Sequence, residues 1–201
     1  FNQKYLSNYF LALIQSGNNQ NEEALKLFNS SKYLIQQHDN FLREYAFSLV
    51  LNGKVNQAIN QIKTSKNSEN SNFFEANLLY VLDSFKRKDF KQAAKRLKQL
   101  EIFQDDGTYE FIIYKTLDSY NYLFLNKKIK KLDKNFGKLS SITHAFQNCY
   151  LNSDQTNKSF LKVINSNEND YSRYLFFYLE NIIRNEDLEK ARKISSNIDP
   201  L

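Results

Sequence analysis

The chain has 201 residues, of which 41% are apolar, and a formal net charge of +6. This length suffices for a large core and for one or two domains. Four glycines and one proline are too few for a fold of β-hairpins or for a glycine-rich phosphate loop, so we expect an all-helical chain. The single cysteine, Cys149, excludes an intrachain disulfide and a paired-cysteine metal site.

Three alanines recur along the first half of the chain at spacings of 34 and 35 residues: Ala24, Ala58 and Ala93. Each belongs to a stretch whose apolar residues follow the spacing of an amphipathic helix. A period of this length, with a small residue where two helices must approach closely, is typical of stacked helical hairpins. The period therefore predicts helix pairs.

Helical spacing is clearest in the second unit, in two apolar runs: Leu42, Tyr45, Ala46 and Leu49, then Val55, Ala58, Ile59 and Ile62. Gly53 lies between the runs, which predicts two helices joined by a tight turn. The unit resembles the tetratricopeptide repeat and is similar to its bacterial class. The small, glycine, alanine and large apolar positions of that repeat are filled by Ala46, Gly53, Ala58 and Ile62.

The resemblance implies one domain over 1–201, an all-α solenoid of about six stacked antiparallel helix pairs in a right-handed superhelix. We expect the units near 4–36, 39–69, 73–104, 108–139, 141–166 and 168–201. The fourth pair is expected over 109–123 and 127–139, the fifth over 141–151 and 154–164, and an extended polar loop over 18–21. The chain lacks Met and ends near Pro200 as at a hinge, so we expect a fragment of a longer protein.

Residues with catalytic or metal-binding chemistry are few. His38 and His144 lack partners at metal-ligand spacing, so we expect no metal and no cofactor. Paired acids at 22–23, 105–106 and 186–187 suit helix first turns better than catalysis. Cys149 suits packing better than nucleophilic attack. We therefore expect a protein that is not an enzyme, or a docking arm of a longer enzyme.

In the tetratricopeptide family the first helices of successive pairs line a concave groove that holds peptides or partner helices. The resemblance implies groove residues in three units: Asn40, Arg43, Phe47 and Val50; Glu75, Leu78, Leu82 and Phe85; Arg173, Phe176, Glu180 and Arg184. It thus implies a non-catalytic scaffold with a protein or peptide partner, although Phe47 and Phe85 suit a core equally well. Glu44, Glu75 and Leu79 exclude the family's carboxylate clamp, which needs Asn, Lys and Arg there.

A basic run offers an alternative function. Six lysines fall within twelve residues, after a tyrosine-rich stretch: Lys127, Lys128, Lys130, Lys131, Lys134 and Lys138. On a helix over 127–138 they would bind RNA or another acidic surface, although a solvated helix face is the simpler interpretation. No apolar run approaches the length of a membrane span. Tyr5 and Leu6 resemble the start of exported bacterial members, which favours the cell envelope over the cytoplasm.

Overall fold

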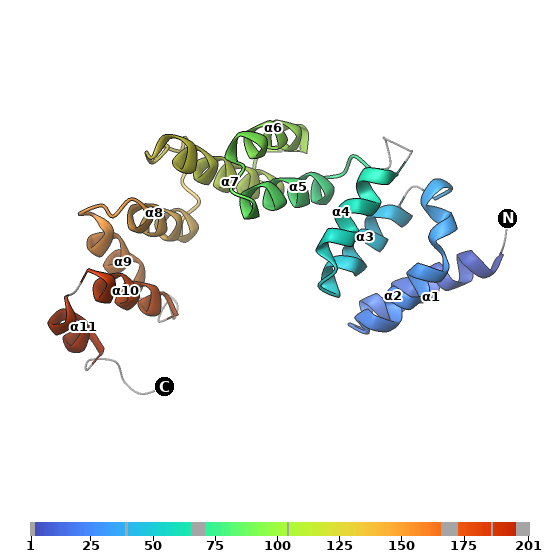
Figure 1. Ribbon diagram of the computed structural model, residues 1–201, viewed down its shortest axis with the longest axis horizontal. Helices are drawn as coiled ribbons and strands as arrows, with labels where there is room; N and C mark the ends of the chain where they lie inside the picture. Colours follow the sequence, from blue (N-terminus) through green and yellow to red (C-terminus); the bar gives the residue numbers. More distant parts are fainter. Residues whose placement is uncertain are drawn as a thin grey trace. The chain divides into compact units, whose positions relative to one another are not determined.

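The computed structural model describes residues 3–38, 40–65, 71–103, 105–165, 173–185 and 187–195. Within these ranges the structure consists of helices and the turns between them, without a β-strand, which confirms the all-α prediction (Figure 1). None of the described helices is both long and apolar enough to cross a membrane. The chain divides into two compact units, Phe1–Asp106 (unit 1) and Gly107–Leu201 (unit 2).

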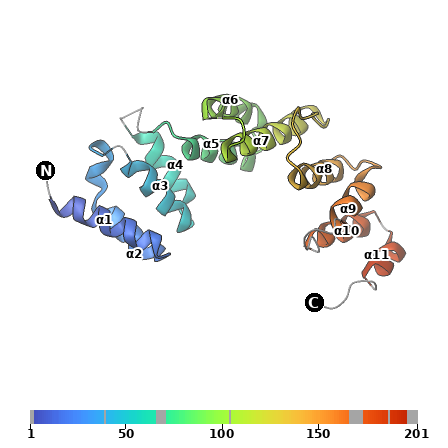
Figure 2. The ribbon, with the colours of Figure 1, turned by 180° about the vertical axis from the view of Figure 1, so that it is seen from behind.

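Unit 1 contains three consecutive helix pairs. The pairs are α1 (Gln3–Gly17) with α2 (Asn21–Ser30), α3 (Phe41–Leu51) with α4 (Val55–Thr64), and α5 (Phe74–Lys86) with α6 (Phe90–Leu100). Short 3-10 helices follow the first and third pairs, η1 (Lys32–Gln36) and η2 (Glu101–Phe103). Successive pairs touch through α2 and α3 and through α4 and α5 (Figure 2).

The turns inside these three pairs share one backbone geometry. Each is three residues long, and its middle residue is left-handed: Asn19 (φ 59°), Gly53 (φ 72°) and Lys88 (φ 58°). The following N–H donates to the carbonyl five residues back, as from Lys54 to Leu49 at 2.8 Å and from Asp89 to Ser84 at 2.9 Å. These bonds satisfy carbonyls that a helix end leaves without partners. The chain is thereby reversed within three residues.

The recurring alanines lie five residues after these left-handed positions. Ala24, Ala58 and Ala93 are each at most 1% exposed, and the N–H of each donates to the residue that closes the turn, at 2.9 to 3.0 Å. A methyl side chain at this register lets the second helix pack closely against the first. The spacings of 34 and 35 residues thus arise because the same turn, with the same close helix contact beside it, recurs in each pair.

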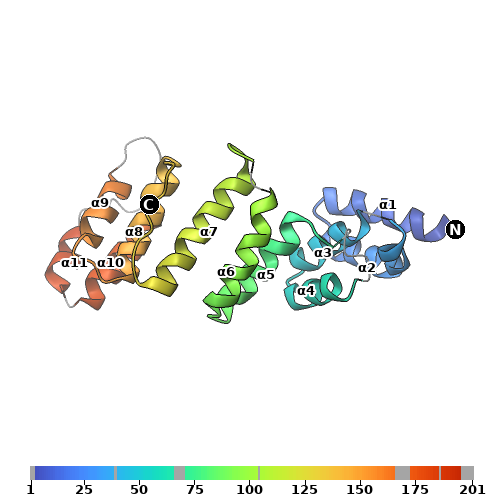
Figure 3. The ribbon, with the colours of Figure 1, turned by 90° about the horizontal axis from the view of Figure 1, so that it is seen from above.

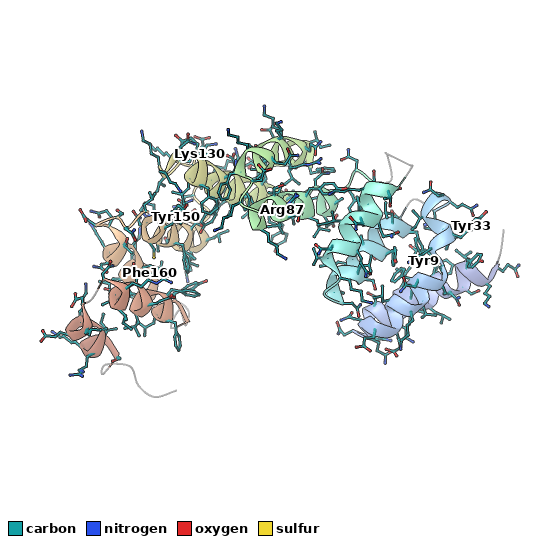
Figure 4. The ribbon with its side chains drawn as sticks, viewed as in Figure 1. Tyr9, Tyr33, Arg87, Lys130, Tyr150 and Phe160 are labelled. Carbon is teal, nitrogen blue, oxygen red and sulfur yellow. The ribbon has the colours of Figure 1, made fainter. Side chains whose placement is uncertain are left out.

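Aromatic packing joins the first two pairs of unit 1. Tyr9 of α1, labelled in Figure 4, has its ring centroid 6.1 Å from that of Phe28 on α2 and 5.2 Å from that of Phe41 on α3. Phe41 also lies 6.0 Å from Tyr45, whose hydroxyl donates to Asn29 Oδ1 at 2.8 Å. All four rings are buried. This cluster holds α1, α2 and α3 together through apolar burial.

Unit 2 begins with a long helix, α7 (Tyr109–Asn126), followed by α8 (Lys138–Tyr150), α9 (Thr156–Ile164), α10 (Arg173–Arg184) and α11 (Leu188–Ser195). Contacts run from α8 to α9, from α9 to α10 and from α10 to α11 (Figure 3). Phe146 packs edge-on against Phe160 and Phe177, with centroids 5.5 and 5.0 Å apart. Left-handed Asn152 (φ 51°) reverses the chain between α8 and α9.

The helix predicted over 127–139 is wrong. The chain is irregular from 127 to 137, and α8 begins at Lys138. Lys127 ends α7 in the left-handed conformation (φ 52°), and its N–H donates to the Leu123 carbonyl at 2.8 Å. Lysines three and four residues apart would repel one another along a helix. The described residues therefore contain five helix pairs and the single helix α7, not six pairs.

The sequence also predicts a polar loop, a single domain, a fifth pair and a sixth unit. The polar loop expected over 18–21 is a three-residue turn, because Asn21 is already the first residue of α2. The expected domain over 1–201 divides into two compact units, while the fifth pair lies close to its predicted ranges, as α8 and α9. Parts of the expected sixth unit, 168–172, 186 and 196–201, lie outside the described residues.

The left-handed conformation of Lys88 predicts the direction in which a glycine substitution changes the free energy of unfolding. A left-handed conformation costs an L-residue about 1–2 kcal/mol, which glycine avoids at the expense of greater freedom in the unfolded chain. We expect Lys88→Gly to raise the free energy of unfolding by about 0.5 kcal/mol in urea titrations followed by circular dichroism. Lys95→Gly, on an exposed face of α6, should lower it by about 1 kcal/mol. Equal losses in both variants would contradict the assigned turn.

Close packing at the recurring alanines makes a second prediction. Ala58 is 0% exposed, so the larger side chain of Ala58→Leu should overpack the contact between α3 and α4. We expect a loss of about 1–3 kcal/mol in the free energy of unfolding. Gln57→Leu, at an exposed position of the same helix, is the control and should change stability little. An unchanged urea midpoint for Ala58→Leu would rule out the close contact.

Candidate functional site

A groove of about 540 Å³ lies between α3 and α5 in unit 1. We call it the α3–α5 groove; its lining residues are Arg43, Glu44, Ala46, Phe47, Val50, Phe73, Glu75, Leu78, Leu79 and Leu82. Six of the eight positions predicted in the second and third units belong to this lining. Sequence reasoning did not place Ala46 and Phe73 there, because both look like ordinary core residues in the sequence.

The walls of the α3–α5 groove are apolar and accessible from both helices. Phe47 of α3 is 52% exposed and Leu82 of α5 is 44% exposed, although both are large hydrophobic side chains. Val50, Leu78 and Leu79 are half-buried between them. Phe47 therefore belongs to the groove and not to the core. Accessible apolar side chains from two helices in one concavity are typical of sites that bind another protein.

A charged end bounds the groove. Arg43 on α3 donates to Glu75 Oε1 on α5 at 2.5 Å, and their side chains are 52% and 43% exposed. A pair this exposed contributes at most about 1 kcal/mol to stability. The main effect of this ion pair is on geometry, because it links α3 and α5, the two helices that form the groove walls. Glu44 also lines the groove and is half-buried, so the lining contains two carboxylates and one guanidinium.

The other predicted groove residues lie elsewhere. Asn40 is exposed just before α3, outside the groove lining. Phe85 is half-buried and packs edge-on against Phe90 at 6.1 Å, inside the α5–α6 pair and outside the groove lining. In unit 2, Phe176 is 80% exposed on α10, and Arg184 donates to Glu180 at 2.5 Å on the same helix. The side chain of Arg173 lies outside the described residues.

A second concavity, of about 750 Å³, lies in unit 2. We call it the basic pocket; it is lined by segment 127–137, α8 and α9 through Ile129, Lys130, Lys131, Leu132, Asp133, Lys134, Asn135, Ser140, Ser141, Thr143, His144, Gln147, Gln155, Lys158, Ser159 and Lys162. Three of the five predicted patch lysines, Lys130, Lys131 and Lys134, belong to this lining. Lys128 does not, and Lys127 instead donates to the Tyr150 hydroxyl at 2.5 Å.

Contacts with α7 hold the lining of the basic pocket. Lys130 pairs with Asp118 at 2.5 Å, and Figure 4 labels this lysine. Gln147 Nε2 on α8 donates to Ser119 Oγ on α7 at 3.1 Å. Burial raises the pKa of Tyr120 on α7, and a hydrogen bond with Thr143 opposes that rise. Polar bonds thus join α7 to α8 along the wall of the pocket.

The histidine and acidic residues that could supply catalytic chemistry make packing contacts or lie at helix starts. Among the described residues no three His, Cys, Asp or Glu side chains are grouped to hold a metal ion. His38 packs edge-on against Tyr9 at 4.9 Å. Glu22 and Glu23 lie in the first turn of α2, and Asp187 accepts from the Lys190 N–H at 3.2 Å, as predicted for helix starts. Glu186 lies outside the described residues.

No family model matches the chain, and no curated protein or solved structure is significantly similar to it. The resemblance to the tetratricopeptide repeat therefore stays a prediction. Any function must therefore be inferred from the geometry of two concavities: an apolar groove with a charged end in unit 1 and a basic pocket in unit 2.

Cys149 supplies a prediction about reactivity. Its Sγ donates to Asn181 Oδ1 at 3.4 Å, and burial raises the pKa of the thiol, opposed by Arg184 and assisted by Glu180. Because the thiolate is the nucleophile, a raised pKa leaves less of it at neutral pH. We expect iodoacetamide to alkylate the native protein more slowly than the urea-unfolded chain, with a rate that rises at higher pH. A native rate equal to that of the unfolded chain would contradict this burial.

Proposed function

We propose that the protein is a non-catalytic scaffold that binds a protein partner in the α3–α5 groove. The observation that carries the proposal is the accessibility of apolar side chains, led by Phe47 and Leu82, from two helices of one concavity. Burying such side chains against a partner removes apolar surface from water, which is the dominant favourable term in most protein association.

The groove chemistry indicates the kind of segment that it holds. Its walls suit two or three large apolar side chains spaced along one face of a helix or an extended peptide. The groove lining contains two carboxylates, Glu44 and Glu75, and one cation, Arg43. A basic residue of the partner placed there would complement the remaining negative charge. The proposed ligand is thus an apolar peptide segment with a basic residue at one end.

We further infer that the helix pairs stack in the manner of a tetratricopeptide solenoid. The repeated turn, the buried alanines and the successive contacts of unit 1 support this arrangement. The first helix of unit 1 also carries large exposed apolar residues: Phe10, Leu11 and Ile14. In a solenoid these would extend the apolar surface beyond α3 and α5, as first helices do in the family that the sequence resembles.

Selection from a random peptide library on the purified chain tests the proposal. We expect enriched peptides to share large apolar residues at helical or alternating spacing together with a basic residue. Binding should persist at high salt, since apolar burial is not screened. A library that yields no enriched peptide, or catalytic turnover without peptide binding, would contradict the proposal.

Substitutions in the groove give the quantitative prediction. The double variant Phe47→Glu and Leu82→Glu places two charges on the apolar walls, and we expect its affinity for a selected peptide to fall by about tenfold or more. The measurement is isothermal titration calorimetry with one peptide on every variant.

The control carries the same change at exposed apolar positions outside the groove. Val55 and Ile102 are 38% and 69% exposed in unit 1, and neither lines the groove. Val55→Glu with Ile102→Glu should leave the affinity within about twofold. Equal losses in the two double variants would show that charge alone, and not the groove, governs binding.

A further inference from the structure

The basic pocket gathers lysines from two separate stretches of unit 2. Lys130, Lys131 and Lys134 come from segment 127–137, whereas Lys158 and Lys162 are one helical turn apart on α9. Asp133 is the only carboxylate among the described lining residues. A concavity lined mostly by one sign of charge concentrates ions of the opposite sign. Its charge therefore favours an anionic occupant.

Three of these lysines have their charge available for a ligand. Lys131, Lys158 and Lys162 are exposed, and no carboxylate of the described residues pairs with them. Lys130, by contrast, is held by Asp118 at 2.5 Å. An anion between the three exposed lysines would relieve the repulsion among them.

Two serine hydroxyls in the lining accept hydrogen bonds from neighbouring protein groups. Ser159 Oγ accepts from Asn148 Nδ2 at 3.2 Å, and Ser140 Oγ accepts from the Phe136 N–H at 2.8 Å. A hydroxyl that accepts in this way keeps its own proton for another acceptor. Both serines lie in the lining with the lysines, so the pocket offers neutral donors beside its charges.

The types of donor in the lining restrict which class of ligand the pocket suits. The described lining contains no arginine, so lysines alone supply its positive charge. It also contains no Phe or Tyr on which the bases of a single-stranded nucleic acid would stack. Lysine point charges with hydroxyl donors suit phosphate oxygens. A volume of about 750 Å³ is that of a small-molecule site.

We propose that the basic pocket binds a small soluble molecule that carries two or more phosphate groups. Lys131, Lys158 and Lys162 supply the charge, and Ser159 with Ser140 supplies hydrogen bonds. This site is independent of the peptide proposal, because the pocket belongs to unit 2 and the α3–α5 groove to unit 1.

Titration calorimetry of the full chain with inorganic tripolyphosphate tests the site. We expect saturable binding that weakens as salt screens the lysines. Lys158→Ala with Lys162→Ala should weaken binding by about tenfold, and Ser159→Ala by about threefold without any change of charge. Helical circular dichroism and the urea midpoint establish that each variant remains folded.

A matched pair of lysines provides the control. Lys91 and Lys95 are exposed on α6 with the same spacing as Lys158 and Lys162. Lys91→Ala with Lys95→Ala should leave the tripolyphosphate affinity within about twofold. Absence of binding to the unsubstituted chain, or equal losses in the two double variants, would overturn the proposal.

Two further probes separate phosphate recognition from other acidic ligands. Oligouridylate tests a nucleic acid, and a polyglutamate peptide of the same total charge as tripolyphosphate tests an acidic protein segment. We expect both to bind more weakly than tripolyphosphate. Tighter binding of oligouridylate would assign the pocket to nucleic acid, and equal binding of polyglutamate would show that charge alone is recognised; either result overturns the proposal.

Discussion

Reversal of the chain at a left-handed residue is the constraint on which the helix pairs depend. Asn19, Gly53 and Lys88 all adopt it, and the bond that follows each one closes the preceding helix. The closing residue starts the next helix, so a buried alanine falls at a constant register from the turn. One local geometry thereby determines both the direction of the second helix and how closely it packs.

The groove follows from this pairing. In α3, the side chains of Leu42, Tyr45 and Leu49 are buried inside unit 1. The helical period then places Arg43, Phe47 and Val50 together on the remaining side. Glu75, Leu78 and Leu82 also lie three and four residues apart, on one side of α5, and the Arg43–Glu75 pair links the two helices. Apolar side chains stay accessible there because the pairs bury their other faces.

Local pattern predicted the pairs well but the turns poorly. The period of the alanines and the spacing of the groove residues can be read along the chain, whereas Lys88 gives no sign of a left-handed backbone. The helix predicted over segment 127–137 is wrong because it rests on interpolation of the repeat period and not on an apolar pattern of the segment itself. The segment's shape depends on distant partners, such as Asp118 and Phe111, and on repulsion among lysines. Lys158 lines the same pocket as that segment only because of the tertiary fold, which the local pattern does not indicate.

The structure of the chain with a library-selected peptide bound tests the proposed groove most directly. We expect the peptide to lie between α3 and α5, with apolar side chains against Phe47 and Leu82 and a basic residue near Glu44 and Glu75. A peptide bound on another surface of the chain, with the α3–α5 groove still open, would contradict it.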